Sequence, residues 1–307
     1  MPSLNVRSAA RKSSCGTPVQ LKRLTVALLS SALVLIVLSP AVTTRAQVQV
    51  AETNSMTPQT IPQAAPNQAP AQEHPLEPAL RMAYKIRDNI NANVRDYTAT
   101  IVKRERINGK VGDPQYALIK VRQQPFSVYL GFIGPADVKG QECMYIEGAN
   151  EGKMFAHAPP GTLRGKFGTV SLEPNSAMAM KDQRYPITEI GIANLTKRLI
   201  EVGEHDKQYG ECDVQFFQGA KVNGQGCTVI QVTHPVPRRN FLFNIARIYV
   251  DDQLQLPIRY EAYDWPAQAG GSPELLEEYT YMNLKVNQGL TDADFDVRNP
   301  NYTFNLK

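Results

Sequence analysis

The stretch RIYVDDQLQLPIRYEAYDW, residues 247–265, decides the expected fold, together with YTYMNLKVNQGLTDADFD at residues 279–296. Runs rich in β-branched and aromatic residues lie at 247–250 and 257–263, on either side of an Asp-Asp turn. A third such run, at 275–286, follows a loop that contains Pro and Gly. These runs predict the last strands of an antiparallel sheet. Neither segment contains a catalytic signature.

The chain before this stretch predicts a strand meander and two helices. Apolar residues recur every three or four positions from Ala79 to Val94, which predicts an amphipathic helix over 79–95. A second helix is expected at 188–202, ended by Gly203. Short alternating runs joined by Gly, Pro and Asn turns bring the expected strands to about ten or eleven. The sequence therefore predicts an α+β fold: one long, curved antiparallel sheet with two main helices against its concave face.

Three segments are expected along the 307 residues. Basic residues precede an apolar run at 24–38, and small residues flank Arg45. This layout predicts a secretory signal peptide over 1–46, with an uncleaved signal anchor as the alternative. Residues 47–78 are rich in Pro, Gln and Ala and lack aromatic residues, which predicts a disordered linker. Residues 79–307 then form a single domain, which we expect to be periplasmic or otherwise exported.

The basic charge of the chain belongs to the expected leader. Six of the 33 Lys and Arg residues and none of the 29 Asp and Glu residues lie within 1–46, so the rest of the chain has a net charge of about −2. Nucleic-acid binding needs a concentrated basic surface, which this composition does not supply. We therefore expect no nucleic-acid partner.

Three cysteines, Cys143, Cys212 and Cys227, follow the expected leader. An odd number cannot all pair within one chain. A bridge between Cys212 and Cys227 is possible on adjacent predicted strands, but a tight turn at 223–224 would place Cys212 opposite Pro235, so the bridge requires a longer loop. The alternative is three small buried side chains.

Several short motifs carry a resemblance to a known family. They are ARIYVD (246–251), LPIRY (256–260), DWP (264–266), the segment 287–295 and NPNY (299–302). With them, the whole expected domain resembles the exported bacterial family named domain of unknown function 1571. The order of helix, meander, helix and strands is similar to the periplasmic lipoprotein-carrier (LolA-like) fold. This resemblance implies a half-open β-barrel whose hydrophobic cavity, lidded by helices, holds acyl chains or other apolar ligands, and it brings no catalytic residues.

Alternation along the strands predicts which side chains enter such a cavity. Tyr279 and Tyr281 share a face with Asn283 and Lys285, and we expect them on the wet outer surface.

The loop at 173–186 has no period and is expected to cover an opening. The candidate ligand-binding residues of the apolar cavity are Val128, Leu130, Phe132, Ile248, Val250, Ile258 and Tyr260.

Enzyme and metal signatures are missing from the sequence. The four histidines lack zinc-site spacing, and no GxSxG or GxxxxGK[ST] motif occurs. Neighbouring strand residues point to opposite faces, so the carboxylate pairs at 251–252 and 277–278 are poor glycosidase candidates and fit turns or edges better. The aspartates within 292–296 lack the Gly and Glu of an EF-hand. We expect no catalytic residues, no metal and no cofactor.

The leading hypothesis is an exported, non-catalytic binding protein that holds a lipid, a lipoprotein acyl chain or another apolar envelope ligand. We expect a monomer that meets a membrane surface or an envelope protein. The alternative is a structural or protein-interaction module of the cell envelope without a small ligand. A hydrolase that uses the paired carboxylates is a third hypothesis. The first two differ in whether residues such as Leu130 and Ile248 pack fully against the helices or leave a cavity.

Overall fold

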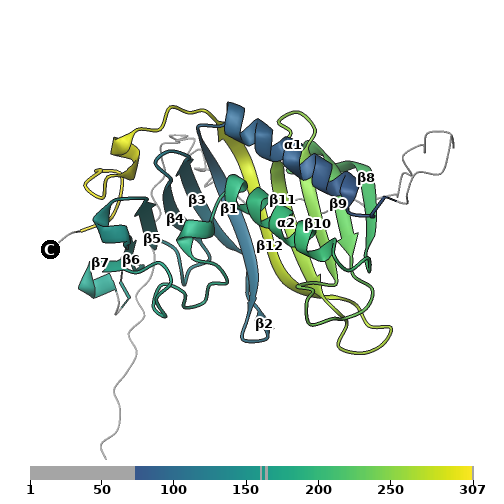
Figure 1. Cartoon of the computed structure of the whole chain (residues 1–307). Coiled ribbons are helices and arrows are strands. Elements are labelled where there is room, and N and C mark those ends of the chain that lie inside the picture. The colour runs from purple at the N-terminus through teal and green to yellow at the C-terminus, as the bar shows by residue number, and fades with distance from the viewer. Residues whose placement is uncertain (1–72, 160, 163–164, 306–307) are drawn as a thin grey trace, which may run out of the picture. The chain divides into compact units, whose positions relative to one another are not determined.

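A computed structural model describes residues 73–159, 161–162 and 165–305. In this part of the chain, twelve strands form one antiparallel sheet, and two α-helices cover one of its faces (Figure 1). The helices are α1 (Glu77–Asn93) and α2 (Ile192–Asp206). The strands are β1 (Asp96–Ile107), β2 (Lys110–Val111), β3 (Gln115–Arg122), β4 (Ser127–Gly134), β5 (Glu142–Ile146), β6 (Met154–His157), β7 (Thr169–Leu172), β8 (Asp213–Val222), β9 (Gln225–Thr233), β10 (Ile245–Asp251), β11 (Pro257–Asp264) and β12 (Glu274–Val286).

The first long strand and the last strand pair at the centre of the sheet. β1 runs antiparallel to β12 from Tyr97 opposite Val286 to Glu105 opposite Glu277. From this pair, one meander continues through β3, β4, β5 and β6 to β7, and the other continues through β11, β10 and β9 to β8. The helix α2 lies in the connection between the two edge strands, β7 and β8. Because the sheet ends at these two edges, the predicted α+β fold with a half-open sheet is confirmed.

The predicted signal peptide and most of the predicted linker lie outside the described residues. The first helix begins at Glu77, two residues before the predicted start, with Pro78 in its first turn, where a missing N–H costs nothing. Within the described ranges, no helix is long and apolar enough to cross a membrane.

The predicted end of the second helix is wrong. The helix begins at Ile192, after a single 3₁₀ turn at Ile187–Glu189, and continues through Gly203 to Asp206. A β-carbon at position 203 would lie 2.9 Å from Leu80 Cδ2, on α1. Glycine at this position therefore allows the two helices to approach closely, and it does not end the helix.

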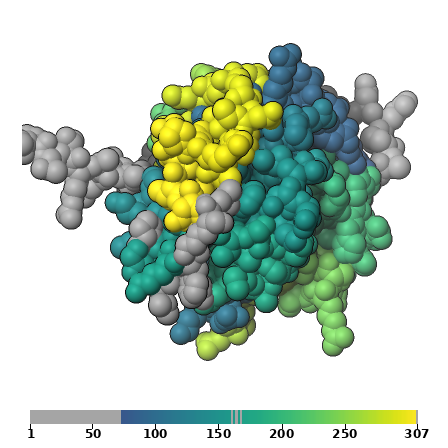
Figure 2. Space-filling model, turned by 90° about the vertical axis from the view of Figure 1, so that its left-hand side faces the viewer, coloured from purple at the N-terminus to yellow at the C-terminus, as the bar shows by residue number. Residues whose placement is uncertain are grey.

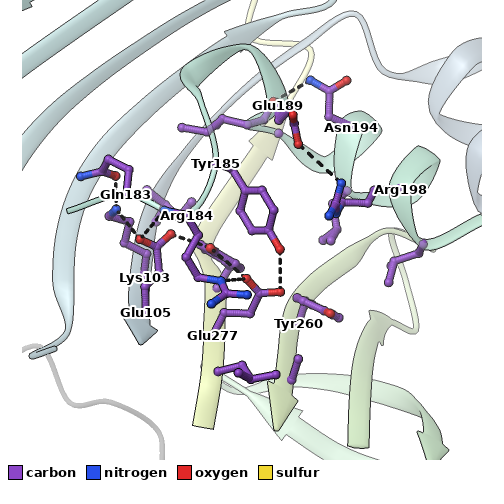
Figure 3. Close-up of a pocket in the computed structure, with 18 of the residues that line it drawn as sticks. Lys103, Glu105, Gln183, Arg184, Tyr185, Glu189, Asn194, Arg198, Tyr260 and Glu277 are labelled. Carbon is purple, nitrogen blue, oxygen red and sulfur yellow. Dashed lines mark hydrogen bonds and ion pairs between the residues drawn. The ribbon is translucent and has the colours of Figure 1, made fainter. Parts of the chain in front are cut away.

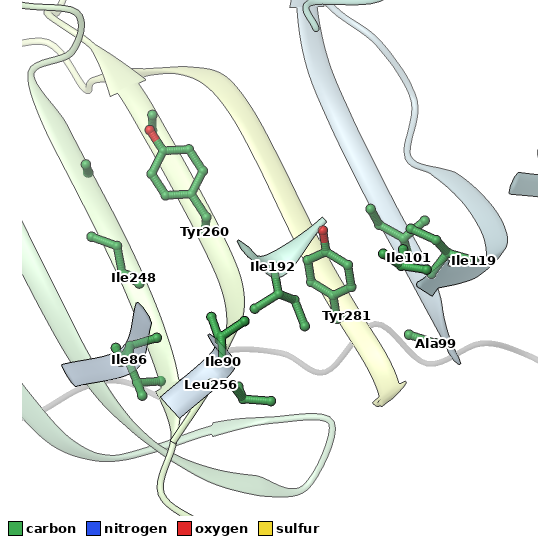
Figure 4. Packing of buried hydrophobic residues seen from close by; sticks show 14 of the residues in the cluster. Ile86, Ile90, Ala99, Ile101, Ile119, Ile192, Ile248, Leu256, Tyr260 and Tyr281 are labelled. Atoms are coloured by element: carbon green, nitrogen blue, oxygen red, sulfur yellow. The ribbon is translucent and has the colours of Figure 1, made fainter. Parts of the chain in front are cut away.

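One face of the sheet forms the main core against the helices (Figure 4). Ile86 and Ile90 point from α1 and Ile192 points from α2 toward buried strand side chains such as Ile248. Truncation of a fully buried isoleucine to alanine typically costs about 2–5 kcal/mol, so this layer contributes much of the stability.

The chain after β12 covers part of the opposite face of the sheet. Figure 2 shows these last residues, in yellow, lying over the teal strands. Tyr302 stacks on Tyr129 of β4 with ring centroids 4.1 Å apart. Glu142 of β5 accepts hydrogen bonds from the Tyr129 hydroxyl at 2.8 Å and from the Thr303 backbone N–H at 2.7 Å. Strand β4 is therefore buried on both faces.

The Cys212–Cys227 bridge, which the sequence left possible, does not form. All three described cysteines are free and buried. The turn at 223–224 is tight and pairs Val222 with Gln225, so Cys227 lies opposite Ala220 on the edge strand β8. The three thiols are therefore small buried side chains.

Candidate functional site

A cavity of about 410 Å³ lies between the sheet and α2. Its volume is within the range of about 300–1,000 Å³ that is usual for small-molecule sites. Strands β1, β3, β4, β11 and β12 supply one wall, and α2 with the segment before it supplies the other. Gln183–Tyr185 of the loop that was expected to cover an opening also line the cavity. Its apolar lining consists of Ile101, Ala117, Leu130, Phe132, Ile190, Leu195, Leu199, Val202, Leu242, Phe243, Ala262 and Leu276.

A second, smaller cavity of about 70 Å³ lies beneath α1. Side chains of α1, α2 and strands β9 to β11 surround it. Leu199, Val202 and Phe243 line both cavities. These three side chains therefore form the partition between the two spaces.

Four of the seven predicted cavity residues line a cavity. Leu130, Phe132 and Tyr260 line the larger one, and Ile248 lines the smaller one. Val128 has no exposed surface and packs in the main core. The inner face of the sheet is therefore only partly filled by the helices.

Ile258 is on the other face of the sheet, which contradicts the prediction. Tyr249 pairs with Arg259 and Val250 pairs with Pro257, so Ile258 is the extra residue of a β-bulge. Ile258 packs with Tyr249 in a separate cluster, whereas Val250 stays in the main core. Pro257 cannot donate to the ladder and begins β11 at this bulge, which shifts the alternation by one residue.

A second bulge turns Glu277 toward the cavity. Ala262 pairs with Glu277 and Tyr263 pairs with Leu275, so Leu276 is the extra residue, and both Leu276 and Glu277 line the cavity. The expectation that Glu277 lies at a turn or an edge is wrong, because β12 is a central strand.

Tyr279 and Tyr281 also line the cavity, so their predicted position on the outer surface is wrong. The pairing register between β12 and β1 shifts near Asn283, which has a φ of 53°. Because of this irregularity, the two tyrosines no longer share a face of the sheet with Lys285, which is exposed.

Glu277 has donors on both of its oxygens (Figure 3). Arg184 Nε donates to Oε2 at 2.8 Å, and the Tyr185 hydroxyl donates to Oε1 at 3.0 Å. Burial raises the pKa of Glu277 above its usual value, while the positive charge of Arg184 opposes this rise. Burial and the nearby carboxylate raise the pKa of Tyr185 to about 12, so its hydroxyl stays protonated and keeps donating.

Glu105 lies opposite Glu277 on the neighbouring strand and is also fully engaged. The Tyr279 hydroxyl donates to Glu105 Oε1 at 2.5 Å, and Lys103 Nζ lies 3.2 Å from Oε2. The backbone N–H of Arg184 donates to the same Oε2 at 3.3 Å. Two carboxylates directly opposite each other repel, and one cation beside each offsets this repulsion. The network therefore ties the loop before α2 to the centre of the sheet.

The start of α2 is fixed to the sheet by two tyrosines. The backbone N–H of Ile192 donates to the Tyr97 hydroxyl at 3.0 Å, and the Tyr97 and Tyr281 rings meet edge to face at 6.2 Å. Gly191 has a φ of 113°, and a β-carbon there would lie 2.9 Å from the Tyr97 hydroxyl oxygen. Only glycine fits this position without strain.

Exposed lining residues mark where the cavity meets solvent. Arg198 and Leu242 are examples: the Arg198 side chain is 46% exposed and Leu242 is 58% exposed. Arg198 lies over the Tyr185 ring at 4.9 Å from its centroid. Its ion pair with Glu189 is long, with Nη1 and Oε2 3.8 Å apart. The cavity therefore has an apolar part and a buried charged part, and it opens at a charged mouth.

The other carboxylates singled out from the sequence lie apart from the cavity. Asp251 accepts the backbone N–H groups of its own turn, and Glu278 Oε2 lies 3.3 Å from Arg259 on the other face. The three aspartates of 292–296 each have a basic partner. Across the described ranges, no group of three or more His, Cys, Asp and Glu side chains is arranged to hold a metal ion.

A buried contact between His234 and Asp206 was not predicted from the sequence. His234 Nε2 lies 3.0 Å from Asp206 Oδ2, and His205 Nδ1 lies 2.9 Å from Asp206 Oδ1. The His234 ring stacks on Phe241 at 3.9 Å. The contact joins the end of α2 to the loop between β9 and β10. His234 and Asp206 are 28 residues apart in the sequence, so no local pattern predicts their contact.

The family model described as protein of unknown function (DUF1571) matches residues 94–304. No curated protein matches the chain.

Several solved structures are similar over most of their length. A DUF1329 family protein from Desulfovibrio piger is 16% identical, with 73% of this chain and 98% of that chain covered and a TM-score of 0.35. A putative outer membrane lipoprotein-sorting protein domain from Vibrio parahaemolyticus is 13% identical, with 71% and 95% covered and a TM-score of 0.33. A LolA superfamily protein from Nitrosomonas europaea is 10% identical, with 70% and 97% covered and a TM-score of 0.29.

Proposed function

The chain belongs to the DUF1571 family, and we propose that it is an exported, non-catalytic binding protein that holds a lipid, a lipoprotein acyl chain or another apolar ligand. The observation that carries this proposal is the cavity of about 410 Å³ between α2 and the sheet. Protein interiors are usually packed with few voids larger than a water molecule. A space of this size is therefore a site for an occupant.

The character of the lining supports the same conclusion. Water gains few hydrogen bonds against the apolar lining at Leu130, Phe132 and Leu199, whereas an alkyl chain contacts it favourably.

The chemistry of the lining favours binding over catalysis. Both buried carboxylates, Glu105 and Glu277, have hydrogen-bond or ion-pair partners on both oxygens. These partners direct both carboxylates toward groups of the protein itself, and a catalytic base must instead reach a substrate proton. The expected export signal places the protein among envelope components, so a membrane surface or an envelope protein is the source or the recipient of the ligand. The protein acts as a monomer in this proposal.

Native mass spectrometry of the full-length protein, before and after delipidation, tests the proposal. The wild type should carry an apolar molecule that delipidation removes. Ala262→Phe, which fills the cavity from β11, should carry less of it while remaining folded. Val236→Phe, at an exposed position, is the matched control and should carry as much as the wild type. A protein that never carries an apolar molecule, before or after exposure to lipids, would contradict the proposal and favour a structural or protein-interaction module.

A further inference from the structure

Some hydrogen-bonding groups around the cavity have partners within the protein, and others do not. Glu105 and Glu277, the buried acceptors, have protein partners on both oxygens. Two donors, Arg198 on α2 and Tyr260 on β11, have no hydrogen-bond partner among the described residues. Both lie on the opposite side of Tyr185 from Arg184 (Figure 3). A ligand that enters here therefore meets free donors, and it must supply the acceptor.

Arg198 is weakly held. Its one ion pair among the described residues joins Nη1 to Glu189 Oε2 at 3.8 Å, which is too long for a hydrogen bond. Glu189 is itself 47% exposed, so water screens this contact. The guanidinium lies over the Tyr185 ring, which fixes its position at the mouth of the cavity.

Tyr260 offers a second donor. Its side chain is buried, lines the cavity, and has no hydrogen-bond partner among the residues that the structure describes. Burial and the charge of Glu277 raise the pKa of Tyr260 well above its usual value, so the hydroxyl keeps its proton. Tyr260 and Arg198 line the same cavity and lie on the same side of Tyr185 (Figure 3).

A buried acceptor without a partner among the described residues lies elsewhere in the cavity. The Gln115 side-chain oxygen is buried without a partner among the described residues. Gln115 is on β3 and Tyr260 is on β11, three strands apart in the sheet order. At about 4.8 Å per strand, the two lie roughly 14 Å apart. The amide therefore does not compete for the same head group.

We infer that Arg198 and Tyr260 bind the carboxylate of a long-chain fatty acid whose alkyl chain occupies the cavity. This inference rests on the proposed function and adds the head group to it. A carboxylate accepts from a guanidinium and a phenol at once, and such charge-assisted bonds are the stronger ones. The head group then lies at the charged mouth and the chain lies against the apolar interior. Glu189 is the group that the ligand displaces from Arg198.

The test compares hexadecanoate, hexadecanol and hexadecylamine, titrated separately into the delipidated full-length protein at a pH where the fatty acid is ionised. Calorimetry or displacement of an apolar fluorophore gives the affinities. The wild type should bind hexadecanoate about tenfold more tightly than hexadecanol. Arg198→Gln should remove this difference, and Tyr260→Phe should reduce it roughly threefold, with hexadecanol affinity falling less than hexadecanoate affinity in both.

Two further variants sharpen the result. Glu189→Gln removes the competitor and should increase the hexadecanoate affinity alone. Arg87→Gln, on an exposed arginine of α1, is the matched control and should behave as the wild type. Equal affinities for acid and alcohol in the wild type, a preference for the amine, or an equal loss of both ligands in Arg198→Gln would overturn the head-group inference and leave the proposed function intact. No binding of any of the three would overturn both.

Discussion

Arg184 Nε lies 2.8 Å from Glu277 Oε2, and this bond joins the loop before α2 to a central strand of the sheet. Glu277 is buried and Arg184 is only partly exposed. Loss of the cation leaves a buried carboxylate without its charge partner, which is costly. The pair therefore holds the wall of the cavity in place.

Substitution of Arg184 should destabilise the protein for this reason. Arg184→Met is expected to lower the free energy of unfolding by about 1–3 kcal/mol, less than for a fully buried pair because Arg184 is partly in water. Urea denaturation gives the value. The double variant Arg184→Met with Glu277→Gln should recover part of the loss, because no unpaired charge remains. A double variant that is less stable than the single one would refute this account.

Gly191 should tolerate no side chain. Gly191→Ala is expected to cost about 1–3 kcal/mol, because alanine is strained at this φ and its β-carbon meets the Tyr97 hydroxyl. Gly210→Ala is the matched control: its φ is also positive, at 64°, but nothing lies within 4 Å of the added carbon. Thermal unfolding of both variants separates backbone strain from the clash. A loss at position 191 no larger than at position 210 would exclude the clash.

The attachment of the C-terminal segment should weaken in acid. Partial burial acts to raise the pKa of Asp294, but bonds from Lys120 Nζ at 2.8 Å and the Thr291 N–H at 3.0 Å lower it on balance. The folded pKa lies below the unfolded one, so the contribution of this group is present at neutral pH and is lost as the pH falls through the folded pKa.

Asp294→Asn provides the comparison. At neutral pH it should be less stable than the wild type by about 0.5–1 kcal/mol, and the two should converge at a pH below the folded pKa of Asp294. Hydrogen exchange of residues 290–304 over a pH series measures this. A difference that persists or grows in acid would mean that the ion pair with Lys120 is not the cause.

The bulge at Pro257 predicts that stability and ligand binding respond differently at two buried residues. Ile258→Ala should cost about 2–4 kcal/mol of stability and leave ligand affinity unchanged, because Ile258 packs on the other face. Leu130→Ala, inside the cavity, should change the affinity. Parallel denaturation and binding measurements distinguish them. Weaker binding in Ile258→Ala at a temperature where it is folded would place Ile258 at the cavity after all.

Much of the fold could be predicted because its signals are local. The turns, the helix stripe of 79–94 and the alternation in 126–132 each depend on neighbouring residues, and the strands formed where these patterns lie. The alternation failed where a bulge inserted one residue, at Ile258 and at Leu276. A bulge depends on the partner strand as well as on the strand itself, so the alternation of apolar and polar residues along one strand does not reveal it.

The candidate site was harder to predict, because its polar half comes from distant segments. Lys103 and Glu105 lie on β1, Arg184 and Tyr185 on the loop before α2, and Glu277 on β12. No spacing in the sequence connects them. The sequence placed Glu277 at a turn or an edge, and only mutual neutralisation allows these charged groups to be buried. Periodicity placed Leu130 and Phe132 on one face of their strand, and the family resemblance implied the cavity that they line.

Crystallographic soaking with a bromine-tipped long-chain alcohol tests the central claim most directly, since it asks whether an alkyl chain occupies the space between α2 and the sheet. Anomalous scattering locates the bromine without prior assumptions. The bromine should lie inside the cavity bounded by Leu130, Leu199 and Tyr281, and it should be absent from the Ala262→Phe variant. Bromine found only on the outer surface, or a cavity closed by its own side chains, would contradict the claim.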